Sequence, residues 1–198
     1  MSMQYKSIKV QNDMFVSIIK NNKELMMILD YISQLNLPNF YIAAGSVFQT
    51  IWNYYDKKPL NYKIKDIDII YYDANNLSIE DENELENNII NHFSKLGMDY
   101  IFDVHNEARM HLWKKNENAN INQYKNSEDA IDQWIATVHA IGITKEKDEI
   151  KVYAPYGLSD IFSRTIRPIK HKNNTKELYD KKVESWKSRF NNLNIIEW

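Results

Sequence analysis

Phe40-Tyr-Ile-Ala-Ala-Gly-Ser46 is a short apolar run that ends in two small residues. A continuous apolar run of this length is typical of a buried strand. Residues 47–55 then show the apolar spacing of a helix, so Gly45 and Ser46 are predicted to occupy a strand-to-helix turn. A second run, Asp66-Ile-Asp-Ile-Ile-Tyr-Tyr72, predicts another strand with carboxylates at its start. Strands that alternate with helices predict a mixed α/β fold.

Helices are predicted on both sides of these two runs. Residues 1–38 have the apolar periodicity of two helices, the first of which could be capped by Asn12. Downstream, Ser78 and Asp81 resemble a capping box with Asp in place of the usual Glu. The helix that they open is expected to run to Gly97, a suitable residue for a left-handed C-cap.

The remaining elements complete the predicted architecture. Residues 100–105 form a third apolar strand, and residues 138–144 and 150–154 flank a charged turn in the manner of a hairpin. A polar helix is predicted near residues 176–190. The predicted fold class is α/β (α+β): a mixed β-sheet core flanked by helices, with an N-terminal helical segment and a C-terminal hairpin and helix extension.

Composition excludes several classes of function. The chain has 198 residues and no cysteine, which excludes disulfides, thiolate metal sites and thiol nucleophiles. A formal net charge of −2 argues against binding of polyanions by bulk charge, and no helix-turn-helix or zinc spacing indicates sequence-specific DNA binding. There is no apolar stretch of about 18 residues and no apolar signal core, so we expect a cytoplasmic protein without a membrane partner.

The Gly45-Ser46 turn suits a phosphate group. The N-terminus of a helix presents unpaired amides and a partial positive charge, both of which favour an anion. Gly45 would allow the backbone to approach the ligand, and Ser46 would add a hydroxyl donor. An ordinary turn with an N-cap is the alternative reading of this dipeptide.

Three carboxylates could act together. Asp66 and Asp68 are two apart on a strand and therefore share a face, where they repel each other unless a cation lies between them. Asp103 lies inside the apolar strand 100–105, and a neighbouring position would bring it to the same site; Glu107 and Asp99 are competing candidates for the third acid. Such a set suits Mg²⁺, although an isolated Asp pair can also be a solvated strand end.

Three blocks of sequence carry a family resemblance. They are Ala44-Gly-Ser-Val-Phe-Gln-Thr-Ile-Trp52 with Asp66-Ile-Asp-Ile69, Val104-His-Asn-Glu-Ala-Arg-Met-His-Leu-Trp113, and Val152-Tyr-Ala-Pro-Tyr-Gly-Leu-Ser-Asp-Ile-Phe162. Strand-Gly-Ser-helix followed by hydrophobic-Asp-hydrophobic-Asp resembles the polymerase-β-like nucleotidyltransferase superfamily. Taken together, the blocks are most similar to a family of bacterial nucleotidyltransferase-like proteins, over about residues 40–168.

The resemblance implies a role for each matched residue. Gly45 and Ser46 would bind the β- and γ-phosphates of a nucleoside triphosphate such as ATP. Asp66 and Asp68 would be the ligands of Mg²⁺ or Mn²⁺, and Asp103 would be the third catalytic acid and metal ligand. The reaction would transfer an NMP to the hydroxyl of an unknown acceptor, which could be a small molecule, a protein or an RNA end, and would release pyrophosphate.

Two basic residues are further candidates for phosphate binding. The interval between Ser46 and Asp66 is longer than the superfamily pattern, and it carries four lysines, namely Lys57, Lys58, Lys63 and Lys65. Lys65 is therefore predicted to contact the triphosphate, with a solvated loop as the alternative. Arg109 could reach a phosphate through its planar guanidinium, or it could pair with Asp160 or Glu107.

A single domain is expected to span residues 1–198. Within it we predict N-terminal helices (1–38), a catalytic core (39–115) and a C-terminal extension packed on the core (116–198). A different class of function remains open on the sequence alone, a catalytically inactive nucleotide-sensing or partner-binding module with the same fold.

Overall fold

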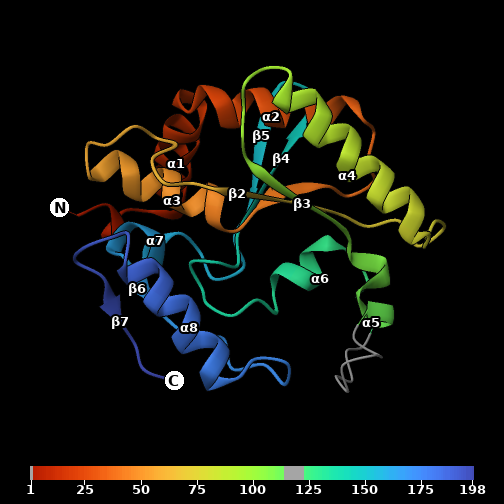
Figure 1. The fold of residues 1–198 in the computed structure, drawn as a ribbon. Helices are drawn as coiled ribbons and strands as arrows, with labels where there is room; N and C mark the ends of the chain where they lie inside the picture. The colour runs from red at the N-terminus through yellow and green to blue at the C-terminus, as the bar shows by residue number, and fades with distance from the viewer. Residues whose placement is uncertain (1, 114–122) are drawn as a thin grey trace.

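The computed structural model describes residues 2–113 and 123–198, which build a mixed α/β fold around one central sheet (Figure 1). In chain order the elements are η1 (Met3–Tyr5), α1 (Ile8–Asn21), α2 (Lys23–Gln34), β1 (Tyr41–Ala43), α3 (Gly45–Tyr55), β2 (Asp66–Tyr71), α4 (Ile79–Ser94), β3 (Ile101–Asn106), η2 (Glu107–Arg109), α5 (Met110–Trp113), α6 (Ser127–Ile131), β4 (Gly142–Glu146), β5 (Glu149–Tyr153), α7 (Ser159–Ser163), β6 (Thr165–Ile166), α8 (Lys176–Lys187) and β7 (Asn194–Ile195).

The central sheet has five strands in the order β3-β2-β1-β4-β5. β2 and β3 are parallel, and the other neighbours are antiparallel. In the parallel pair Asp68 lies opposite Asp103, while on the other side of β2 it lies opposite Ala43 of β1. The predicted fold class is confirmed: a mixed sheet flanked by helices.

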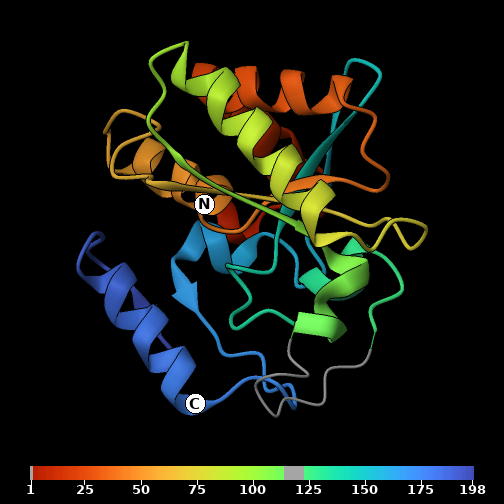
Figure 2. The ribbon, with the colours of Figure 1, turned by 45° about the vertical axis from the view of Figure 1, so that its right-hand side comes forward.

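The two faces of the sheet have different chemistry. Ile67 and Ile69 of β2 and Phe102 and Val104 of β3 face the main hydrophobic core, which α1 to α4 help to build. Because side chains alternate along a strand, the carboxylates of β2 and β3 point to the opposite face. Figures 1 and 2 show α8 on that opposite side of the sheet, away from α1, α2 and α4.

The predicted hairpin is part of the central sheet. β4 pairs with β1, and β5 continues the sheet at its edge, so two of the five strands come from the region beyond residue 116. Two further short strands, β6 and β7, pair in parallel beside α8. The division of the chain at residues 38 and 115 stays a prediction.

Most of the longer helices begin with a side-chain cap. Ser78 accepts a hydrogen bond from the amide of Asp81, as predicted, and Gly97 after α4 has a φ of 74°. The prediction that Asn12 caps the first helix is wrong, because this helix begins earlier and Ser7 accepts the amide hydrogen bond of Val10. The capped helices are α1, α2, α4, α6 and α8, with the caps Ser7, Asn22, Ser78, Asn126 and Thr175.

Trp52 links α3 to the C-terminal part of the chain. Its ring is fully buried and packs edge-on against Phe48 and Phe190. Its indole nitrogen donates to the carbonyl oxygen of Ile161 in α7, over 2.9 Å. A buried indole needs such a partner, and here the partner fixes α7 against α3. Within the part of the chain that the structure describes, no helix is long and apolar enough to cross a membrane.

The junction between β1 and α3 is strained. Ala44, and not Gly45, has the positive φ, at 53° with a ψ of −125°. The amide of Ala44 donates to the carbonyl of Ile141, and its own carbonyl accepts from Phe48 in the first turn of α3. Neighbouring hydrogen bonds therefore hold an alanine in a conformation that favours glycine.

We expect Ala44→Gly to leave the free energy of unfolding nearly unchanged, because relief of backbone strain offsets the loss of a buried methyl group. The matched control is Ala43→Gly in β1, which lacks that strain and should destabilise the protein by roughly 1–2 kcal/mol. Urea unfolding of both variants measures the difference. Equal losses of stability would contradict the strain at Ala44.

Candidate functional site

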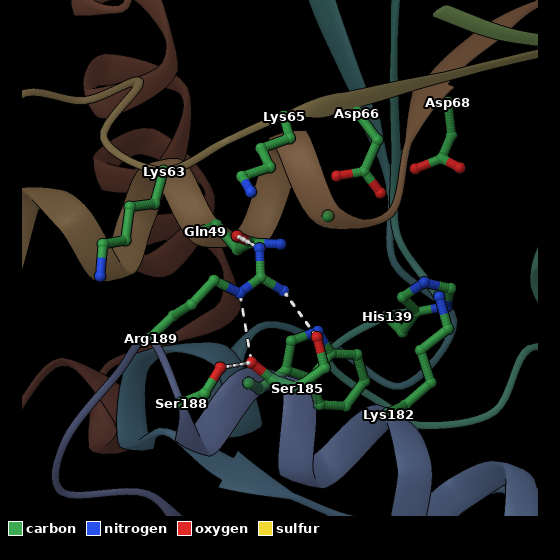
Figure 3. A pocket seen from close by; sticks show the side chains of 12 residues that line it. Gln49, Lys63, Lys65, Asp66, Asp68, His139, Lys182, Ser185, Ser188 and Arg189 are labelled. Atoms are coloured by element: carbon green, nitrogen blue, oxygen red, sulfur yellow. Dashed lines mark hydrogen bonds between the residues drawn. The ribbon is translucent and has the colours of Figure 1, made fainter. Parts of the chain in front are cut away.

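A cavity of about 460 Å³ lies between the carboxylate face of the sheet and α8 (Figure 3). From the sheet side, Asp66 and Asp68 of β2 point toward it, and Lys65 precedes them. From the opposite side, α8 and the residues that follow it contribute Lys182 and Arg189. The cavity therefore has acidic groups on one wall and basic groups on the other.

The N-terminus of α3 opens into this cavity at Gly45. Ala44 occupies the N-cap position and offers no side-chain acceptor, in contrast to the caps of α1, α2 and α4. The first amides of a helix have no partner within the helix. The end of α3 thus presents amide donors and a partial positive charge to the cavity.

Gln49 holds Arg189 above this helix end. A Cβ atom built on Gly45 would lie 2.8 Å from the side-chain nitrogen Nε2 of Gln49. The absence of a side chain at Gly45 therefore allows the Gln49 side chain to fold back over the turn. The Gln49 side-chain oxygen accepts a hydrogen bond of 2.9 Å from Arg189. Burial lowers the pKa of Arg189, while Asp66 favours its charged form.

The Ser46 side chain does not line the cavity where the triphosphate was predicted to bind. Its side chain is fully buried, and its hydroxyl donates to the carbonyl of Ala43 over 3.2 Å. Gly45 lines the cavity, whereas Ser46 is not among the lining residues. In this arrangement the hydroxyl of Ser46 stabilises the turn, and the backbone supplies the donors.

The lysines between α3 and β2 divide into two pairs. Lys63 and Lys65 line the cavity, whereas Lys58 forms an ion pair of 3.5 Å with Asp56 and Lys57 lies outside the lining. With Lys182 and Arg189, four basic side chains surround the cavity against two carboxylates. A ligand with several negative charges fits this balance.

Asp68 is surrounded by other carboxylates. Burial, followed by repulsion from Asp66 and from Asp103, raises the pKa of Asp68 to about 6. Lys182 and His105 oppose the shift without cancelling it. The folded protein therefore concentrates negative charge at this point of the sheet, which is the condition that a bound divalent cation would relieve.

Asp103 is adjacent to Asp68 but is already paired. His105, two residues further along β3, lies 2.8 Å from the Asp103 carboxylate and 4.0 Å from Glu82. The hydrogen bond from His105 lowers the pKa of Asp103. Burial disfavours the imidazolium, but hydrogen bonds to Asp103 and Glu82 outweigh it and raise the pKa of His105 to about 10.

Among residues 2–113 and 123–198, no group of three or more histidine, aspartate or glutamate side chains is arranged as a metal site. Asp66 and Asp68 face the cavity, while Asp103 turns to His105. The alternative third acids lie elsewhere. Asp99 lines a separate depression with Tyr100, and Glu107 is buried in η2 and lines a neighbouring cavity instead of this one. Of the three candidates for the third acid, Asp103 is the one that lies directly opposite Asp68 in the sheet.

Arg109 does not line the cavity. Its guanidinium is buried, forms an ion pair of 2.8 Å with Glu82 and donates to the carbonyl of Leu77. Glu82 also accepts from the backbone amide of Asn106 at the end of β3. Arg109 therefore fixes α4 to the end of β3. Arg189 and Lys182 supply the basic groups of the cavity wall opposite the sheet.

Sequence reasoning missed the contribution of α8. Lys182 and Ser185 of α8 and Arg189, which follows it, line the cavity, although the sequence of α8 is that of a polar surface helix. His139, which precedes β4, also lines it. Burial, followed by the charge of Lys182, lowers the pKa of His139 to about 3, so this imidazole is neutral at ordinary pH. A clue was available in the spacing of Lys182, Ser185 and Arg189, which would share one face of the helix predicted near residues 176–190.

Comparison with known proteins identifies the class. A family model described as nucleotidyltransferase matches residues 30–195, so the chain belongs to this nucleotidyltransferase family. An NMR structure described as revealing a CCA-adding enzyme head domain superposes with a TM-score of 0.78 at 27% sequence identity, covering 93% of this chain and 95% of the other. The fold is that of the polymerase-β-like nucleotidyltransferases. A search of the curated proteins found no match.

We expect Asp68→Asn to stabilise the protein when divalent cations are removed. The raised pKa means that ionised Asp68 costs stability as the pH rises from about 4 to about 6, and the cost persists above this range. The gain at pH 8 in EDTA should be on the order of 1–3 kcal/mol by chemical unfolding. Asp148→Asn, in the exposed β4–β5 turn, is the control and should change stability by less than about 0.5 kcal/mol. A loss of stability in Asp68→Asn would contradict the repulsion.

We expect Arg109→Leu to lower the free energy of unfolding by about 3 kcal/mol, because it leaves Glu82 buried without its ion-pair partner. Nucleotide affinity, measured by calorimetry at a temperature where the variant is folded, should remain that of the wild type. Arg189→Leu is the matched comparison and should show the reverse pattern. Weakened nucleotide binding in folded Arg109→Leu would restore the phosphate-binding role predicted from the sequence.

Proposed function

We propose that this protein is a metal-dependent nucleotidyltransferase that transfers an NMP from a nucleoside triphosphate to an acceptor hydroxyl. One observation carries the proposal: a single cavity joins the uncapped end of α3 and four basic side chains to the carboxylates of Asp66 and Asp68. Family membership supports the reaction class.

The basic side of the cavity would bind the triphosphate. The backbone at Gly45 lies at the start of α3, and Lys63, Lys65 and Arg189 line the same cavity. Helix amides and fixed cations neutralise an anion without reorganisation, so they would hold the departing pyrophosphate as its charge develops. Ser46 would act indirectly, by stabilising the turn.

Asp66 and Asp68 would hold Mg²⁺ or Mn²⁺, and the repulsion at Asp68 makes this pair suitable for a cation. A cation held by these two carboxylates would supply positive charge against the transferring phosphoryl group. In the reaction the acceptor oxygen forms a bond to the α-phosphorus while the bond to the bridging oxygen breaks. Asp103, beside Asp68, is the carboxylate that would take the hydroxyl proton and direct the acceptor.

A second candidate function is nucleotide binding without turnover. The pairing of Asp103 with His105 favours it, since the third acid is engaged in a hydrogen bond instead of facing the cavity. A sensor would keep the basic wall and the cation-binding pair while the acceptor chemistry is lost. The two candidates differ in whether pyrophosphate is released.

The test measures pyrophosphate release from each of the four NTPs with Mg²⁺ or Mn²⁺, in the presence of RNA ends and small-molecule hydroxyl acceptors. We expect metal-dependent release by the wild type and at least a hundredfold loss in Asp66→Asn and in Asp68→Asn, with Asp148→Asn unaffected. Arg189→Gln should weaken NTP binding tenfold or more, because a hydrogen bond to a charged group is lost.

The outcomes separate the candidates. Tight NTP binding without release, in the wild type and across all acceptors, would favour the sensor. Metal-dependent NTP binding that survives in both aspartate variants would contradict the proposed site itself.

A further inference from the structure

A second cavity, of about 570 Å³, adjoins the first. The two share three wall residues: His139, Lys182 and Ser185. Along α8 the second cavity extends toward the start of the helix, at Leu178 and Lys181, and the first toward its end. The two cavities therefore lie next to each other along α8.

The lining of the second cavity differs from that of the first. It includes the aromatic rings of Tyr124 and Trp134 and the apolar side chains of Met110, Ile135 and Leu178. Trp134 is held in place because its backbone carbonyl and that of Gln133 accept hydrogen bonds from Asn174. Aromatic and apolar walls suit a flat ring better than they suit a phosphate.

Two buried polar atoms in this cavity have no hydrogen-bond partner among the described residues. They are the side-chain amide nitrogen of Asn173 and Nδ1 of His139. Asn174, by contrast, uses its amide entirely on backbone carbonyls. A buried polar group without a partner is costly, so these atoms point to a ligand with hydrogen-bonding edges.

Asp66 and Asp68 line the first cavity and not the second. Lys182 belongs to both cavities, and its charge acts on Asp68 and Asp103. Glu107 and Met110, which follow β3 in the chain, line the second cavity. The triphosphate wall lies in the first cavity, at Gly45. A ligand group in the second cavity would therefore lie beside the triphosphate cavity, toward the start of α8.

We infer that the second cavity binds a nucleobase, by stacking on Trp134 and by hydrogen bonding to Asn173. The inference rests on the proposed function, because it assigns the part of the nucleotide that the basic cavity does not hold. The base could belong to the NTP itself or to a nucleotide acceptor. Both sources present the same flat, polar-edged ring, and binding measurements distinguish them.

The test compares ligands with and without a base. Calorimetry with Mg²⁺ measures the affinity for each NTP and for inorganic tripolyphosphate, and then for each free nucleoside added to protein saturated with a non-hydrolysable NTP. If the base belongs to the NTP, Trp134→Ala should lose tenfold or more of the affinity for at least one NTP and keep that for tripolyphosphate. If it belongs to the acceptor, free nucleoside should bind the NTP-saturated wild type and not the variant.

Matched variants separate stacking from folding. Trp134→Phe keeps an aromatic ring and should recover most of the affinity, while Asn173→Ala should change the preference among bases. Trp198→Ala, which removes a tryptophan that contacts Tyr179 and lines neither cavity, should bind every ligand as the wild type does.

Two results would overturn the inference in different ways. If tripolyphosphate binds but Trp134→Ala and Asn173→Ala alter neither NTP nor nucleoside binding, the nucleobase subsite is refuted and the proposed function stands. If the wild type binds neither tripolyphosphate nor any NTP, the proposed function fails and the subsite fails with it.

Discussion

The parallel pairing of β2 with β3 is the constraint on which the site depends. It sets Asp68 beside Asp103 on one face of the sheet, and the alternation of the strands sends Ile67, Ile69, Phe102 and Val104 into the core on the other. A slip of one residue in this register would bury the carboxylates and expose the isoleucines, so the hydrophobic core itself fixes the acidic face. The repulsion between Asp68 and its neighbouring carboxylates is a consequence of that register, and the hydrophobic core stabilises the register.

The opposing wall comes from the far end of the chain. α8 packs through Tyr179, Val183 and Trp186, and this leaves Lys182 and Ser185 directed at the sheet. Arg189 is then held over the end of α3 by Gln49. The first cavity therefore joins residues from β2, α3 and α8 and is charged beside Gly45. The second is aromatic beside Trp134, and an amide and an imidazole nitrogen there have no hydrogen-bond partner among residues 2–113 and 123–198.

Two features of this site are held in place by the surrounding structure: the strained backbone at Ala44 and the carboxylate of Asp103. Ala44 keeps a backbone conformation suited to glycine, and the hydrogen bonds around the β1–α3 turn maintain it. Asp103 is held by His105 and, through His105, lies near Glu82 and its partner Arg109. This network is buried at Glu82 and Arg109 and exposed at Asp103. Arg109 therefore supports the end of β3 and does not line the cavity. Strain and concentrated charge of this kind are typical of functional sites.

The sequence by itself determined the local features: the strand-Gly-Ser-helix turn, the shared face of Asp66 and Asp68, the cap at Ser78 and the family. These follow from periodicity and from neighbouring residues, which sequence records directly. Only the tertiary structure decided which basic groups face the acids. Arg109 carries the donors expected of a phosphate ligand yet pairs with Glu82. Arg189 and Lys182, more than a hundred residues along the chain from Asp66 and Asp68, complete the cavity instead. Which cation meets which anion depends on contacts between distant segments, and no local pattern encodes them.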